Sequence, residues 1–221
     1  HEVAERLAFQ LTGAPPDDTL SAAAEAGQLT DVAQVAEQAR RLLGSSAARD
    51  NWQRIASAWL GLERVPDPDA VVAKDLGFES SGFGFEARQE FERFVSYEVF
   101  DKGNSLQGLF TDPVGFPASD RLAKTLGVAR ADGPQALSNG LGGILLRPAT
   151  LVSGTTLTSP ILRGVFIQRK VLCTTLPSPA ANLVEQRIDS ANLSHIDHPN
   201  REFFTLLTSP AECTACHTMI N

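Results

Sequence analysis

Apolar residues recur at helical spacing through the first hundred residues of the chain. Val3, Leu7 and Leu11 fall at i, i+4 and i+8, with Ala4 and Ala8 beside them, and these five residues draw one apolar stripe. Prolines and glycines close each such stretch, because proline cannot continue a helix and glycine favours its C-terminal cap. The pattern predicts a series of short amphipathic helices.

Three further helices in this part of the chain have a face that we expect to be buried. The first begins after the capping residues Thr30 or Asp31, the second precedes a proline-rich break at Pro66, and the third follows the glycine-rich stretch that ends at Gly84. The residues expected to face inward are Val32, Val35, Ala39, Leu42 and Leu43 in the first, Trp52, Ile55, Trp59 and Leu60 in the second, and Phe91, Phe94, Val95 and Val99 in the third.

The apolar pattern loosens after Lys102, where short helical stretches alternate with proline and glycine. The strongest apolar stretch, Ile161–Leu172, is opened by Ser159-Pro160, an N-cap residue followed by a first-turn proline. An extended loop is expected over residues 180–198, and a final short helix from Pro199 or Asn200 through Leu207.

No segment alternates convincingly between apolar and polar residues, and no internal repeat is present. We therefore predict a mainly α fold, in which a helical bundle is followed by a loop-rich helical region. The expected domains are residues 1–102 for the bundle and residues 103–221 for the loop-rich region.

The charge of the chain excludes some classes of partner. The net charge is -7, so an electrostatic attraction to nucleic acid or to anionic lipid is not expected. No apolar run approaches the length of a membrane span, so no transmembrane segment is expected. The three cysteines are too few for a disulfide framework, and we expect Cys173 to be a buried free thiol.

The other two cysteines form a motif with chemical meaning, Cys213-Thr214-Ala215-Cys216-His217. Thiols at i and i+3 stand on one side of a helical turn, where both reach the two vinyl groups on one edge of a porphyrin. The imidazole directly after the second thiol is then placed to bind the iron. The motif predicts one covalently attached haem c, held by Cys213 and Cys216, with His217 as the proximal iron ligand.

The motif has two other interpretations. A redox-active CxxC pair is disfavoured, because the sequence around it lacks the βαβ pattern in which such pairs occur. Half of a zinc site is the second alternative, and it needs two more ligands, for which His195 and His198 are the candidates.

The distal iron ligand is open at this stage. Met219 is the only methionine, but it lies on the same turn as the proximal histidine and cannot reach the opposite face of the ring. Within the chain, His1, His195 and His198 remain, and the loop before Asn200 places the last two close to the motif. We expect His195 or His198 on the distal side, with surface histidines or a ligand from residues beyond Asn221 as alternatives.

Several elements carry a family resemblance. The stretch Gly143–Val152, the element Ser159–Phe166 (SPILRGVF) and the element Val171–Pro179 (VLCTTLPSP) lead to the CxxCH motif. This series resembles the uncharacterised cytochrome-associated domains of planctomycetes and myxobacteria, with their SPxxRGxF and LCxxLPxPP elements. The stretch Val3–Leu11 and the Ala-rich helix after it are similar to the helical domain of the same proteins. Ala180 departs from the pattern, which has a second proline there.

The resemblance implies an exported, haem-bearing protein without an assigned reaction. We expect a periplasmic or extracellular c-type cytochrome that transfers electrons between redox protein partners in a larger complex, and no catalytic residue is predicted. Two other functions stay open, a peroxidase-like haem oxidoreductase with an open distal site, and a structural or assembly subunit.

Overall fold

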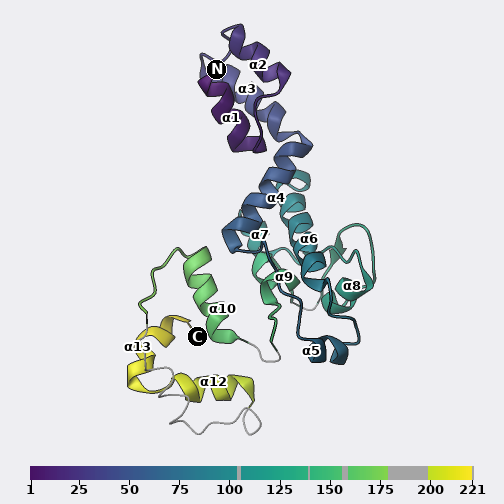
Figure 1. Cartoon of the computed structure of the whole chain (residues 1–221), viewed down its shortest axis with the longest axis vertical. Helices are drawn as coiled ribbons and strands as arrows, with labels where there is room; N and C mark the ends of the chain where they lie inside the picture. The colour runs from purple at the N-terminus through teal and green to yellow at the C-terminus, as the bar shows by residue number, and fades with distance from the viewer. Residues whose placement is uncertain (104–105, 139, 156–158, 179–198, 221) are drawn as a thin grey trace. The chain divides into compact units, whose positions relative to one another are not determined.

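The computed structural model describes residues 1–103, 106–138, 140–155, 159–178 and 199–220 (Figure 1). The chain divides into two compact units, His1–Gly154 and Thr155–Asn221. Helices dominate both units, which confirms the mainly α fold. Between His1 and Lys102 every regular element is a helix, as the apolar spacing predicted.

The N-terminal unit begins with three helices, α1 (Glu2–Thr12), α2 (Asp18–Glu25) and α3 (Val32–Leu43), which share a small core. Ala4, Ala8, Leu20 and Leu42 are buried in it, and Leu7 and Leu11 pack against it. Val3, expected in the same stripe, is instead 44% exposed. Small alanines therefore form the innermost row of α1, and the larger side chains flank them.

Two longer helices lie side by side in this unit, α4 (Ser46–Leu60) and α6 (Phe83–Ser96) (Figure 1). The indole nitrogen of Trp52 donates to the carbonyl of Val95 at 3.0 Å. The buried row of α4 contains Ala56 and Leu60, so the predicted inward positions of Ile55 and Trp59 were wrong, with 47% and 36% exposure. Both residues fall beside the contact row, because each step along a helix turns the side chain by about 100°.

Shorter elements complete the N-terminal unit, and several of them pack onto α6. The expected division after Lys102 falls inside this unit, at the end of the π-helical turn η1, and the expected domain bounds stay a prediction. Two strands of two residues each pair Val114 with Ala136. Strands this short do not show the alternation of apolar and polar residues in the sequence. The elements are α5 (Ala70–Asp75), η1 (Tyr97–Asp101), α7 (Leu106–Thr111), β1 (Val114–Gly115), α8 (Asp120–Leu126), β2 (Gln135–Ala136), η2 (Ile144–Leu146) and α9 (Pro148–Leu151).

A buried ion pair ties the last part of this unit to α6. Arg147 donates to Glu90 at 2.9 Å and to the carbonyl of Val114 at 2.5 Å, and both charged side chains are 0% exposed. The guanidinium also lies 4.5 Å from the ring centre of Phe94. Burial raises the pKa of Glu90, while Arg147 opposes that rise. This cluster lies where the chain returns to α6 after a detour of some fifty residues.

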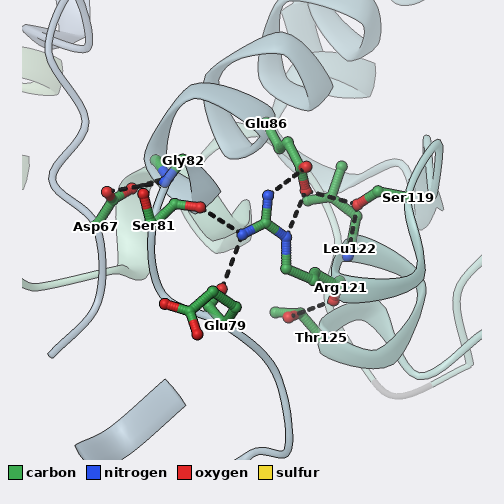
Figure 2. Close-up of polar contacts among 10 residues, drawn as sticks. Asp67, Glu79, Ser81, Gly82, Glu86, Ser119, Arg121, Leu122 and Thr125 are labelled. Atoms are coloured by element: carbon green, nitrogen blue, oxygen red, sulfur yellow. Dashed lines mark hydrogen bonds and ion pairs between the residues drawn. The ribbon is translucent and has the colours of Figure 1, made fainter. Parts of the chain in front are cut away.

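A second polar network holds the start of α6 (Figure 2). Asp67 accepts hydrogen bonds from the backbone N–H groups of Gly82 and Gly84, at 2.9 and 2.8 Å. Arg121 of α8 pairs with Glu86 at 2.5 Å and donates to two carbonyls of the loop before α6. Asp67 thus satisfies backbone donors that a helix start leaves without partners.

Replacement of Asp67 with alanine is expected to cost about 1 kcal/mol of the free energy of unfolding, the usual effect of losing a helix cap. The backbone hydrogen bonds from Gly84 and Gly82 lower the pKa of Asp67 from its ordinary 3.8. Its stabilisation is therefore present above pH 3.8 and is lost as the pH falls through the lowered pKa. Thermal unfolding against pH should show the difference from Asp67→Ala shrinking in acid. The exposed Asp132→Ala serves as the control, and an equal loss there would contradict the cap.

The C-terminal unit contains α10 (Pro160–Phe166), η3 (Ile167–Val171), α12 (Asn200–Thr208) and α13 (Ala211–Ile220). The helix start at Ser159-Pro160 is confirmed, and the π-helical turn η3 continues that helix through Val171. The predicted loop 180–198 lies outside the described residues. Cys173 is exposed, so its predicted burial was wrong; it follows the end of η3 with a φ of 53°.

Candidate functional site

The CxxCH motif lies wholly within α13, because the helix starts just before it. The carbonyl of Pro210 accepts hydrogen bonds from the N–H groups of Cys213 and Thr214, at 2.9 and 3.0 Å. The hydroxyl of Thr214 donates to the carbonyl of Ala211 at 3.0 Å. These bonds form the first turn of α13, so the spacing of the motif is realised on a regular helix.

The two thiols and the imidazole share one face of α13. Residues three and four apart are neighbours on a helix, so Cys216 and His217 both lie beside Cys213. All three side chains are half-buried, and both cysteines are free rather than joined in a disulfide. The face therefore presents two available thiols and one imidazole within about one helical turn.

The far end of α13 is held by the helix α10–η3. The side-chain amide of Gln168 donates to the carbonyl of Met219 at 2.6 Å, and the backbone of Ile220 lies against Gly164. Met219 itself is 47% exposed. Met219 is two residues after His217, so the support is close to the expected iron ligand.

Apolar side chains are also exposed elsewhere in the C-terminal unit. No residue of α10, η3 or α13 is fully buried. Leu162 and Leu172 are 67% and 59% exposed. Two free thiols and a neighbouring imidazole on one helix fit the haem that the motif implies.

The structure leaves the remaining predicted ligands untested. His195 and His198 lie outside the described residues, so their roles as distal or zinc ligands stay predictions. His1 is exposed at the start of the N-terminal unit. Within the described ranges, no group of three or more His, Cys, Asp and Glu side chains is arranged to hold a metal ion. A zinc site would thus need ligands from elsewhere.

Comparison with known proteins places the chain among families of unknown function. PSD4, described as a protein of unknown function (DUF1592), matches residues 1–128. The chain belongs to the PSD4 family. In this PSD4 chain a second family, PSCyt3, described as a protein of unknown function (DUF1588), matches residues 142–221. No curated protein and no solved structure matches the chain.

Both matches agree with the resemblance to uncharacterised cytochrome-associated domains, and neither description assigns a ligand or a reaction. The PSCyt3 match contains the whole CxxCH motif and begins inside the N-terminal unit. Arg147 lies in the PSCyt3 match, whereas its partner Glu90 lies in the PSD4 match. The PSD4 chain therefore buries an ion pair between its two family segments. In the part that the structure describes, no helix is both long and apolar enough to cross a membrane.

Gly164 and Gln168 were not predicted from the sequence as site residues. One signal could have found the glycine. A lone glycine inside a helix costs about 1 kcal/mol relative to alanine, so its presence points to a close packing contact. Gln168 gave no signal, because a polar residue on a short amphipathic helix is ordinarily a solvated one.

Proposed function

We propose that this chain is an exported c-type cytochrome module that transfers electrons between protein partners. Cys213 and Cys216 hold one haem c through two thioether bonds, and His217 is the proximal ligand of its iron. The module works in the periplasm or outside the cell, as part of a larger complex. The bound haem supplies a one-electron couple, and the chain's residues attach it, orient it and limit its contact with water.

One observation carries this proposal, the placement of two free, accessible thiols and an imidazole on one face of α13. Thioether formation consumes thiols, so cysteines joined to each other or fully buried would speak against it. Membership in cytochrome-associated families of unknown function supports the same reading.

Charge distribution supports a basic redox partner. The N-terminal unit carries 21 acidic and 14 basic side chains, whereas the C-terminal unit carries five of each. The whole acidic excess thus lies in the unit that lacks the CxxCH motif. We infer that the N-terminal unit attracts basic partners and that the C-terminal unit carries the redox group.

Intact mass spectrometry of the denatured chain tests the attachment. A bare chain has a mass of 23.7 kDa, and we expect that mass plus one haem. Production has to take place in a host that exports the protein and attaches haem. A denatured mass equal to the bare chain, after such production, contradicts the proposal.

Absorption spectra of the reduced protein separate electron transfer from haem catalysis. A six-coordinate iron whose spectrum carbon monoxide does not change supports electron transfer, because both axial positions are then filled. Ready binding of the gas indicates an open distal position and favours the peroxidase-like alternative. The variants His195→Ala and His198→Ala, in the same assay, test the predicted distal ligands.

A further inference from the structure

The C-terminal turn of α13 rests on a seat formed by Gly164 of α10 and Gln168 of η3. We propose that these two are positioning residues, which fix the end of α13 and thereby set the orientation of the His217 imidazole toward the haem iron. This inference rests on the proposed function, and it assigns a role to two residues outside the CxxCH motif.

Gly164 permits a close approach that no other residue permits. A Cβ atom added at Gly164 would lie 2.8 Å from the carbonyl carbon of Ile220 and 2.8 Å from its Cγ2, and closer still to its carbonyl oxygen. Two of those three atoms belong to the backbone, so a rotamer change cannot relieve the clash. Even alanine at this position would force α13 away from α10.

Gln168 holds the same turn through a hydrogen bond. Its amide nitrogen lies 2.6 Å from the carbonyl oxygen of Met219. The last carbonyls of a helix have no partner within the helix, and a side-chain donor that reaches one of them fixes the helix end. Gly164 and Gln168 are four residues apart, so they face α13 from neighbouring positions of the α10–η3 helix.

Gly164 and Gln168 contact α13 close enough to His217 to set the orientation of its imidazole. Met219 and Ile220 are two and three residues after the histidine, on the same continuous helix. A regular helix is stiff over such a length, so a shift of its last turn moves the imidazole as well. A ligand displaced by a fraction of an ångström makes a weaker and differently oriented bond, which alters the iron's redox equilibrium.

The test uses the full 221-residue chain with haem attached. The variants are Gly164→Ala, which drives the two helices apart, and Gln168→Leu, which removes the donor at similar volume. Gly133→Ala is the matched control, because a Cβ atom at Gly133 meets nothing within 4 Å. Gln168→Lys keeps a donor at similar reach and is the rescue variant.

We expect both test variants to keep the haem adduct by mass but to change the iron's environment. The reduced-to-oxidised ratio at a fixed potential should change about tenfold, which is 59 mV for a one-electron couple. The low-spin electron paramagnetic resonance signal should shift with it. Gln168→Lys should restore the unsubstituted values, and Gly133→Ala should leave them unchanged.

Three results would overturn the inference. If the reduction potential and the resonance signal are unchanged in Gln168→Leu, Gly164 and Gln168 are not positioning residues, whatever Gly164→Ala shows. The proposed function would then still stand. Equal changes in Gly133→Ala show a general effect of substitution rather than positioning. Absence of haem from the unsubstituted chain overturns the proposed function, and the inference falls with it.

Discussion

Replacement of both Cys213 and Cys216 with alanine is expected to remove the haem adduct from the chain completely. Each thiol forms one of the two thioether bonds, so the doubly substituted chain has nothing left to bond with on α13. Each single substitution should leave one bond and therefore retain an adduct in part of the protein. Intact mass after denaturation measures all three variants on one scale.

Cys173→Ala is the matched control for this experiment, because Cys173 is the third thiol and is exposed at the end of η3. We expect its adduct to equal that of the unsubstituted chain. If the doubly substituted protein still carries haem after denaturation, attachment does not run through α13. If Cys173→Ala loses the adduct as well, the thiols of the motif are not sufficient.

The CxxCH site could be predicted because it is local in the sequence. Five consecutive residues specify the chemistry, and a helix over 211–220 is enough to place Cys213, Cys216 and His217 on one face. The helix start at Ser159-Pro160 was predictable for the same reason, since N-cap and first-turn proline are adjacent residues. The contact of Gly164 with Ile220 was not, because it joins residues far apart in the chain.

Faces of helices were predicted less well than the helices themselves. In α4, apolar spacing suggested that Ile55 and Trp59 were inward, but the row toward α6 contains Ala56 and Leu60. Apolar spacing points to the largest side chains, whereas a close helix contact favours small ones such as alanine. The exposed Cys173 shows the same bias, since cysteine was expected inside from its average behaviour.

The buried pair of Glu90 and Arg147 was not predicted, for a different reason. Phe83, Ala87 and Phe94 are buried on the face of α6 that also contains Glu90, so a carboxylate interrupts an otherwise apolar row. That interruption was a usable signal for a buried acid. Its partner Arg147 gave none, because it lies 57 residues away and charged residues are ordinarily exposed. A single sequence gives no local signal that shows which two distant residues form a pair.

The position of that pair bears on how the two family segments fold. Residues 1–128 match PSD4 and residues 142–221 match PSCyt3, yet the compact N-terminal unit extends to Gly154. Arg147 brings the first residues of the second segment into the core of the first. The N-terminal unit is therefore expected to need residues 142–154 for its stability.

Arg147→Ala is expected to lower the free energy of unfolding of the N-terminal unit by about 3–5 kcal/mol, because it leaves the carboxylate of Glu90 buried without its cation. One oxygen of that carboxylate, Oε2, already has no hydrogen-bond partner among the described residues. The protein has two tryptophans, Trp52 and Trp59, and both lie in α4. Their fluorescence during urea unfolding therefore reports on this unit alone.

Arg49→Ala is the matched control for the buried pair. Arg49 also pairs with a carboxylate, Asp101 at 2.6 Å, and also lies over a phenylalanine ring, but its side chain is 38% exposed. Water screens such a pair, so its loss should cost no more than about 1 kcal/mol. Equal losses in the two arginine variants would show that burial adds nothing to the Glu90 pair.

The same variant should show a characteristic pH dependence. Burial already raises the pKa of Glu90 above its ordinary 4.5, and removal of Arg147 takes away the charge that opposes this rise. Between pH 4.5 and the raised pKa, the folded state binds more protons than the unfolded state, so stability falls as the pH rises. Arg147→Ala should therefore be least damaging in mild acid and most damaging at neutral pH.

The double variant Glu90→Leu with Arg147→Met removes both charges and should recover most of the loss at pH 7. A deficit in Arg147→Ala that does not change with pH would mean that the carboxylate of Glu90 is not what the arginine stabilises.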